Sequence, residues 1–168
     1  FALILDVVVT VIDIPFDIYS TFVIEEKFGF NKTTRKTFAL DLIKGILLNA
    51  VLSGGLMALL TAVYGWMPEY FWITAFGLMI FFTGFVSYFY SKLIVPIFNK
   101  QTPLPDGELR DAITAFAKEV DFRVKDIYVM DGSKRSSHAN AYFTGFGKNK
   151  RIVLYDTLIE QLTTQETL

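Results

Sequence analysis

The sequence predicts a polytopic α-helical membrane protein with a soluble α+β domain at its C-terminal end. Hydrophobic residues occupy 52% of the 168 positions, and the mean hydropathy is +0.41. Of the 33 charged residues, only 13 fall in residues 1–98. Residues 45–68 and 70–91 carry no formal charge at all. Each run can cross a bilayer as a helix, because about 20 apolar residues span the hydrocarbon core.

Composition also excludes several classes of protein. The chain has no Cys and one His, which excludes a disulfide-stapled module and a Cys-ligated zinc finger. A net charge of −1 argues against nucleic acid as a partner. With one His, a His-rich metal site cannot be assembled from this chain alone.

Residues 1–14 are interpreted as the end of a truncated transmembrane helix. The stretch is apolar but short, and Ile14-Pro15 is expected to end it. Asp6 lies inside it, and Asp13 is expected near the membrane interface. Asp6 is either a functional intramembrane carboxylate or an acid that faces a bundle interior for structural reasons.

Residues 15–44 are expected to form a connector on the cytoplasmic side, and residues 45–98 to form two transmembrane helices joined by a turn at Pro68. The connector holds Lys27, Lys32, Arg35 and Lys36, whereas the turn near Glu69 has no basic residue. Positive residues favour the cytoplasmic face. A pair of buried soluble helices is the alternative, although such helices rarely lack charge on every face.

Residues 99–168 have the pattern of a soluble domain. An amphipathic helix is predicted after Pro105-Asp106, and a strand over residues 126–130. Residues 140–146 and 151–155 are predicted strands around a hairpin tip at 147–150. Thr157 and Glu160 have capping-box spacing and should begin a short helix through Leu162.

Thr163 and Glu166 repeat the capping-box spacing within the last six residues of the chain. They predict a further helix for which the sequence has no room. We therefore expect the chain to be part of a longer protein; a natural C-terminus with frayed residues is the alternative.

Other candidate sites are weak. Neither 131–134 nor 145–148 has the Gly-x4-Gly-Lys-Ser/Thr pattern of a phosphate-binding loop. Ser136, Ser137 and His138 are neighbours, but no third orienting group or oxyanion hole can be identified. The strand over residues 140–146 could bind an extended peptide if it lies at a sheet edge. Asn140, Tyr142 and Thr144 would then face one side, and Ala141, Phe143 and Gly145 the other; a purely structural hairpin is the alternative.

Several motifs resemble those of the membrane-embedded CAAX prenyl endopeptidases, which are zinc metalloproteases related to HtpX. The resemblance is carried by SSHANAYFTGF at 136–146, KNKRIVLYDTL at 148–158, TFVIEEKFGFN at 21–31, PIFNK at 96–100 and Pro103-Leu104. It covers nearly the whole chain.

This resemblance implies a ring of membrane helices around a water-filled chamber, with residues 99–168 forming the N-terminal part of a zincin-like protease domain. The catalytic zinc of the family is held by an HExxH helix and a later Glu. The HExxH motif is absent here. The resemblance therefore implies that zinc is bound by residues beyond Leu168, and that this chain contains no catalytic residue and no metal ligand.

The part of the site that the resemblance assigns to this chain is substrate binding. It implies that Asn140, Ala141, Tyr142 and Phe143 form the edge strand along which the peptide lies antiparallel, preceded by His138, which is not expected to bind zinc. The implied partners are a peptide or prenylated-protein substrate and membrane lipid, with no nucleic acid.

The sequence thus predicts a zinc metalloendopeptidase of a membrane, acting in CAAX-type C-terminal processing or membrane-protein proteolysis, and inactive as this chain alone. The alternative is a non-catalytic membrane module that binds peptides, in effect a pseudoprotease. A transporter is not indicated, because no repeat of interrupted spans is present. The expected location is the bacterial inner membrane, or the endoplasmic reticulum or inner nuclear membrane of a eukaryote, with the protease domain on the cytoplasmic side.

Overall fold

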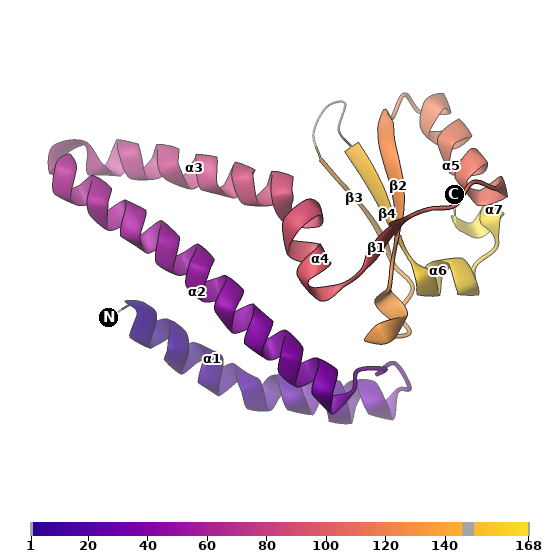
Figure 1. Ribbon diagram of the computed structural model, residues 1–168, viewed down its shortest axis with the longest axis horizontal. Helices are drawn as coiled ribbons and strands as arrows, with labels where there is room; N and C mark the ends of the chain where they lie inside the picture. Colours follow the sequence, from indigo (N-terminus) through magenta and orange to yellow (C-terminus); the bar gives the residue numbers. More distant parts are fainter. Residues whose placement is uncertain (1, 146–149, 168) are drawn as a thin grey trace.

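The computed structural model describes residues 2–145 and 150–167, which form a set of long helices followed by an α+β domain (Figure 1). The long helices are α1 (Ala2–Tyr19), α2 (Arg35–Trp66) and α3 (Phe71–Phe89), and the short α4 (Val95–Phe98) leads into the domain. The domain consists of β1 (Gln101–Pro103), α5 (Glu108–Glu119), β2 (Val124–Met130), β3 (Ala141–Thr144), β4 (Lys150–Tyr155), α6 (Asp156–Gln161) and α7 (Thr164–Thr167).

The first helix is longer than the sequence predicted. It passes through Pro15 and continues as a π-helical segment, Ser20–Glu25. The expectation that Ile14-Pro15 ends the helix is therefore wrong. Proline removes one backbone hydrogen bond, but ending a helix inside an apolar layer would leave several backbone groups without partners, which costs more.

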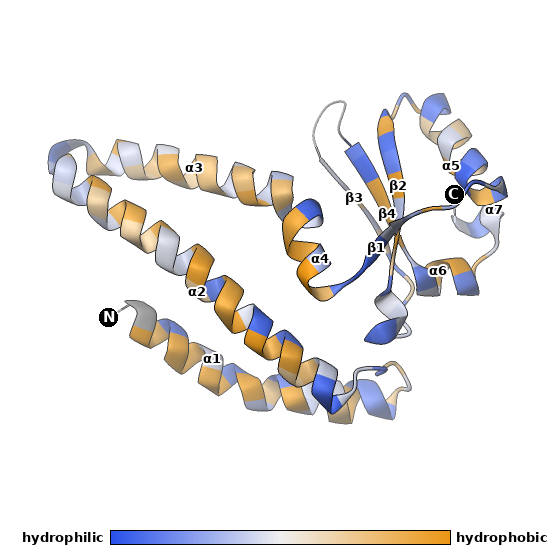
Figure 2. Ribbon diagram, viewed as in Figure 1, coloured by the Kyte–Doolittle hydropathy of each residue, from blue (hydrophilic) through white to orange (hydrophobic). Residues whose placement is uncertain are grey.

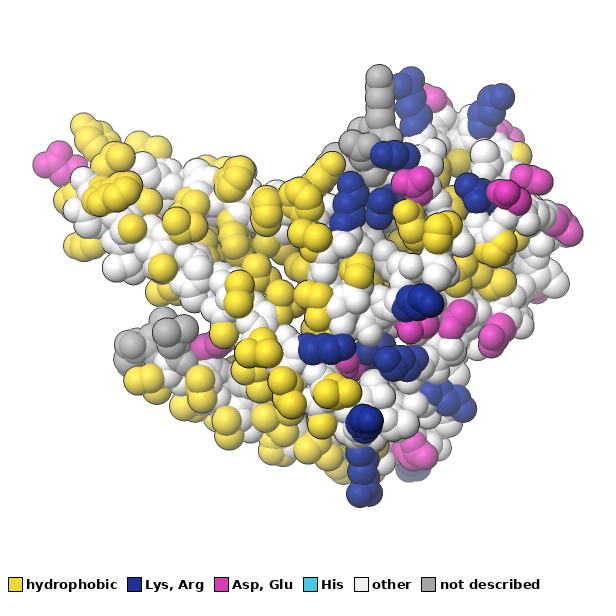
Figure 3. Space-filling view, in the orientation of Figure 1, with side chains coloured by type: hydrophobic (Ala, Val, Ile, Leu, Met, Phe, Trp, Pro, Cys, Tyr) yellow, Lys and Arg dark blue, Asp and Glu magenta, His cyan; other side chains and the backbone are white. Residues whose placement is uncertain are grey.

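Three helical segments are long and apolar enough to cross a membrane: Ile4–Glu25, Arg35–Trp66 and Pro68–Phe98. The first was expected to be only a remnant, yet it reaches 22 residues. Hydrophobic residues occur along the length of these helices (Figure 2), and hydrophobic side chains cover much of the helical surface that faces the viewer in the space-filling view (Figure 3). In each segment, none of the residues of the most apolar stretch is buried inside the described structure. This is expected for segments surrounded by lipid or by further helices.

The turn between α2 and α3 agrees with the prediction. It consists of a 3-10 segment, Pro68–Tyr70, and Trp66 and Trp72 on either side of it are 81% and 72% exposed. Exposed tryptophans are typical of the interface between lipid and water. At its other end α3 becomes a π-helix, Tyr90–Ile94, before α4 begins.

Polar side chains join α1 to α2 within the apolar segments. Asn49 Nδ2 donates a 2.8 Å hydrogen bond to Asp6 Oδ2, and Ser53 Oγ donates one of 2.7 Å to Asn49 Oδ1. This contact supports the structural alternative for Asp6, an acid that faces a neighbouring helix.

The sheet has four strands in the order β1-β2-β4-β3. β2 and β4 pair in parallel, while β1 pairs antiparallel with β2, and β3 with β4. The short strand β1 was not predicted, because three residues that include Pro103 have no strand pattern. β3 is the edge strand on the side of α3 and α4 (Figure 1).

Each face of the sheet has its own apolar core. On one face Ile127 and Leu154 pack with Ile113 of α5 and with Leu104. On the other, Met130 and Val153 pack with Val95 of α4. The second core fixes the position of the sheet relative to the last membrane helix.

The loop after β2 also binds the domain to the helices. The guanidinium of Arg135 donates to both carboxylate oxygens of Asp41 on α2, at 2.7 and 2.9 Å, and to the carbonyl of Phe98 at 2.7 Å. The connector between α1 and α2 pairs with the same loop, where Lys32 N donates to the carbonyl of Arg135 and Ser137 N to that of Phe30.

We predict that Asp41→Asn weakens this docking. The side chains of Arg135 and Asp41 are only 21% and 22% exposed, so the change leaves a partly buried cation without its counter-ion, at a cost of about 1–3 kcal/mol. The midpoint of thermal unfolding in detergent should fall by about 2–4 °C for each kcal/mol. The matched control is Asp106→Asn, which removes an ion pair in which Asp106 is 97% exposed and should leave the midpoint nearly unchanged. Equal midpoints for the two variants would contradict the docking role of Arg135.

Candidate substrate-binding edge

The backbone of β3 alternates between groups that face β4 and groups that face away from it. Tyr155 N donates to the carbonyl of Asn140 at 3.0 Å, and Tyr142 lies opposite Val153. In an antiparallel pair, hydrogen-bonded residues alternate with residues whose N–H and C=O point outward. The backbone groups of Ala141 and Phe143 are therefore directed to the open edge, and no described strand lies beyond them.

Asn140 occupies the start of this edge. Its side-chain Oδ1 accepts a 2.8 Å hydrogen bond from the backbone N–H of Ala141. The first outward-facing donor of the strand is thus held by Asn140 itself. The strand ends at Thr144 and is followed by Gly145, whose φ is +96°, a conformation that favours glycine.

Side chains alternate across β3 as the sequence predicted. Tyr142 and Thr144 are half-buried on the face toward α4, whereas Ala141 and Phe143 are exposed on the other. Phe143 is 71% exposed, and its ring lies edge-on to Phe122, 5.7 Å between centroids.

A cavity of about 640 Å³ lies between the Tyr142 face of β3 and the end of the last membrane helix. Tyr90, Ile94, Val95, Phe98 and Asn99 line it from the helical side, and Met130, Arg135, Tyr142, Phe143, Thr144 and Tyr155 from the domain. Its contact with β3 places it beside the open edge.

Burial affects the two tyrosines of this cavity. Desolvation raises the pKa of both Tyr142 and Tyr155 above the usual value of 10. Hydrogen bonds to Ser91 and Gln101 oppose the shift at Tyr142, and Gln101 Nε2 donates to its hydroxyl at 3.1 Å. Both phenols are therefore neutral at physiological pH.

His138 does not join the edge strand. Its ring stacks on Phe30 with 4.1 Å between centroids, and its Nε2 lies 3.2 Å from Glu25 Oε2 at the end of the first helix. Its carbonyl accepts a hydrogen bond from Thr157 Oγ1. The structure thus brings Asn140, Ala141, Tyr142 and Phe143 together on one edge and turns His138 toward the connector.

The described residues do not provide a zinc site. Among residues 2–145 and 150–167, no three His, Cys, Asp or Glu side chains are close enough to hold a metal ion. The partner of His138 is a single carboxylate, Glu25.

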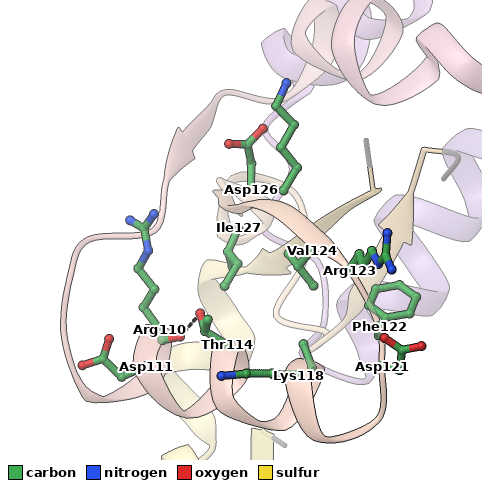
Figure 4. A pocket seen from close by; sticks show the side chains of 12 residues that line it. Arg110, Asp111, Thr114, Lys118, Asp121, Phe122, Arg123, Val124, Asp126 and Ile127 are labelled. Atoms are coloured by element: carbon green, nitrogen blue, oxygen red, sulfur yellow. Dashed lines mark hydrogen bonds between the residues drawn. The ribbon is translucent and has the colours of Figure 1, made fainter. Parts of the chain in front are cut away.

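Two other cavities lack a convergent set of reactive groups. One of about 570 Å³ lies between α5 and β2, and Figure 4 shows that its charged side chains, Arg110, Asp111, Lys118, Asp121 and Arg123 among them, point in different directions. The other, of about 410 Å³, lies between α1 and α2 and reaches from Asn49 to Arg135.

Sequence reasoning missed several residues of the candidate site. Tyr155 and Ser91, which is 1% exposed, lie on segments far from β3 in the sequence. Arg135 and Asp41 are 94 positions apart. No local pattern pairs such residues, and only the fold brings them together.

Comparisons with known proteins identify the family. Residues 1–100 match the family model described as CAAX prenyl protease N-terminal, five membrane helices, and residues 103–168 match the model of peptidase family M48. The chain belongs to the CAAX prenyl proteases of family M48. The resemblance stated from the motifs is confirmed, as is the predicted fold class of membrane helices with an α+β domain.

Individual relatives agree with this assignment. The chain is 47% identical to the CAAX prenyl protease 1 homolog of Oryza sativa over 93% of its length, and 44% identical to that of Homo sapiens over 88%. It matches the crystal structure of S. mikatae Ste24p with a TM-score of 0.88 and 42% identity over 94% of its length. It spans only 37%, 31% and 38% of these three chains.

We predict that Tyr142 titrates above pH 10. A phenol whose pKa is higher in the folded protein than in the unfolded one favours folding below the unfolded pKa, and this contribution is lost as pH rises through the folded pKa. The difference in phenolate absorbance between the wild type and Tyr142→Phe gives the midpoint directly. A midpoint at or below 10 would show that Tyr142 is not desolvated at the cavity.

Proposed function

We propose that the whole protein is a zinc metalloendopeptidase of a membrane, and that this chain supplies the strand on which the substrate peptide lies. The observation that carries the proposal is the open edge of β3 in a chain that belongs to the CAAX prenyl proteases. Membership of a peptidase family favours this function over the alternative, a peptide-binding module without catalytic activity.

The edge binds the peptide through its backbone. The outward-facing carbonyls of Ala141 and Phe143 and the N–H of Phe143 bond to an extended chain, which lies antiparallel to β3 as one more strand of the sheet. The N–H of Ala141 already donates to Asn140 Oδ1, and this bond fixes the backbone at the start of the edge. Pairing through the main chain holds a peptide of any sequence at a set distance from the helices, so selectivity comes from the side-chain pockets on the two faces.

Zinc, in this proposal, is held by residues in the part of the relatives' length that this chain does not span. When bound, the metal activates water for attack on the peptide carbonyl. The residues described here bind and orient the peptide and exclude water from one side of it.

The relatives' names support a prenylated protein as the substrate. The three segments that are long and apolar enough to cross a membrane support a position in a bilayer, in contact with lipid. We propose the endoplasmic reticulum or inner nuclear membrane, since the matching curated relatives come from plants, animals and yeasts. The basic residues of the connector support a cytoplasmic position for the protease domain. The net charge of −1 argues against nucleic acid as a partner.

We predict that this 168-residue chain alone neither binds stoichiometric zinc nor cleaves peptides, whereas the protein at the length of its relatives does both. Zinc content by atomic absorption and cleavage of a fluorogenic CAAX-type peptide should be measured on both. Zinc with turnover in the short chain, or neither in the long one, would overturn the assignment of roles.

We further predict that Asn140→Ala in the whole protein lowers kcat/KM for peptide cleavage by about 2- to 10-fold, the effect of one neutral hydrogen bond. Bound zinc should not change. Asn140→Asp keeps an oxygen that can accept from Ala141 N and is the matched control, with a smaller loss expected. Wild-type turnover in Asn140→Ala would show that Asn140 has no part in binding the peptide.

A further inference from the structure

We propose that the cavity beside Tyr142 and Thr144 is a subsite that takes one large apolar side chain of the bound peptide. The inference rests on the proposed function, because it requires a peptide paired with β3. It adds which side chains of the substrate are selected and which surface of the protein selects them.

Strand geometry directs the peptide side chain into the cavity. Residues that lie opposite one another on neighbouring strands project their side chains to the same face of the sheet. Tyr142 and Thr144 project toward the cavity that they help to line. A peptide residue opposite either of them therefore also projects there, and the residues before and after it project to the other face.

The lining favours an apolar side chain. Ile94, Val95, Phe98 and Met130 present hydrocarbon to the cavity, together with the rings of Tyr90, Tyr142 and Tyr155. A large aliphatic or aromatic side chain that enters gains the free energy of burying its surface.

The charge of the one cation in the described lining is already paired. Arg135 is bonded to both oxygens of Asp41 through Nε and Nη2, while its other terminal nitrogen, Nη1, is buried and has no hydrogen-bond partner among the described residues. Asn99 Nδ2 donates to the carbonyl of Asp131 at 3.3 Å. A carboxylate entering the cavity would lose its water and would meet an arginine whose charge is already neutralised by Asp41.

The opposite face of β3 has a different character. Ala141 is small, and both Ala141 and Phe143 are exposed to solvent. Peptide residues that project to this face remain in water. The two faces thus predict a preference that alternates along the peptide.

The first test is a substitution scan of a cleaved peptide with the whole protein. Each position in turn carries Ala, Leu, Phe or Asp, and kcat/KM is measured. Leu and Phe should exceed Asp by about 10-fold or more at a position that faces the cavity, and by little at the positions on either side of it.

The second test alters the cavity. Thr144→Leu fills its rim and should remove most of the preference for Leu and Phe over Ala at that position, measured as the ratio of kcat/KM values between peptides within the same variant. Thr144→Val keeps the volume of threonine and is the matched control, which should preserve the preference. Tyr90→Ala enlarges the cavity from the opposite wall and should move the preference toward Trp, which keeps the test decisive if Thr144→Leu does not fold.

The outcomes separate this inference from the function on which it rests. If peptides are cleaved but the preference shows no alternation, favours Asp, or is the same in Thr144→Leu as in the wild type, the subsite is overturned and the peptidase remains. If no peptide is cleaved or bound by the whole protein, the proposed function is overturned, and the subsite with it.

Discussion

The guanidinium of Arg135 holds the domain to the membrane helices, and the position of the sheet depends on its contacts. It bonds to Asp41 near the start of α2 and to the carbonyl of Phe98 at the end of α4. Two helices that lie apart in the sequence are thereby fixed to one loop of the domain. Because that loop leads directly into β3, the same contacts set where the open edge lies relative to α3 and α4 (Figure 1).

Apolar packing between α4 and the sheet also holds the domain to the membrane helices. Val95 of α4 and Val153 of β4 share one core, so the last membrane helix and the sheet form a continuous unit. The remaining space between them is the cavity beside Tyr142. A binding edge and a side-chain pocket thus arise from the same junction, and a change that loosens the junction disturbs both.

Much of the membrane part could be predicted from the sequence, because a bilayer imposes length and polarity on a helix. The charge-free run 45–68 lies in α2 up to Trp66 and then enters the turn, and the run 70–91 lies within the segment Pro68–Phe98. The end of the first helix could not be predicted, since proline usually ends a helix in water, whereas an apolar surrounding favours its continuation through Pro15. Local capping chemistry was informative at Thr163, whose N–H donates to Glu166 Oε2 at 2.9 Å in the observed turn. The cap predicted at Thr157 was wrong, because Thr157 lies inside α6 and its Oγ1 donates to the carbonyl of His138.

The candidate site could be predicted only in part. Alternation within β3 is local and gave the two faces correctly, and the likeness of its motif to a known family implied its role. The contacts of Arg135, Tyr155 and Ser91 with this region depend on tertiary structure, so no spacing in the sequence reveals them. His138 lies two residues before Asn140 in the sequence, but stacking on Phe30 turns it away from the edge.

Backbone pairing at β3 is the central claim, and an N-methyl scan of a substrate peptide tests it most directly. Methylation of one amide removes a single donor and leaves the side chains unchanged. With the whole protein, the account predicts that inhibition of cleavage alternates with a period of two, severe where the amide faces the carbonyl of Ala141 or Phe143 and slight at the residues between. An equal effect at every position, or none, would contradict the addition of the peptide as a strand.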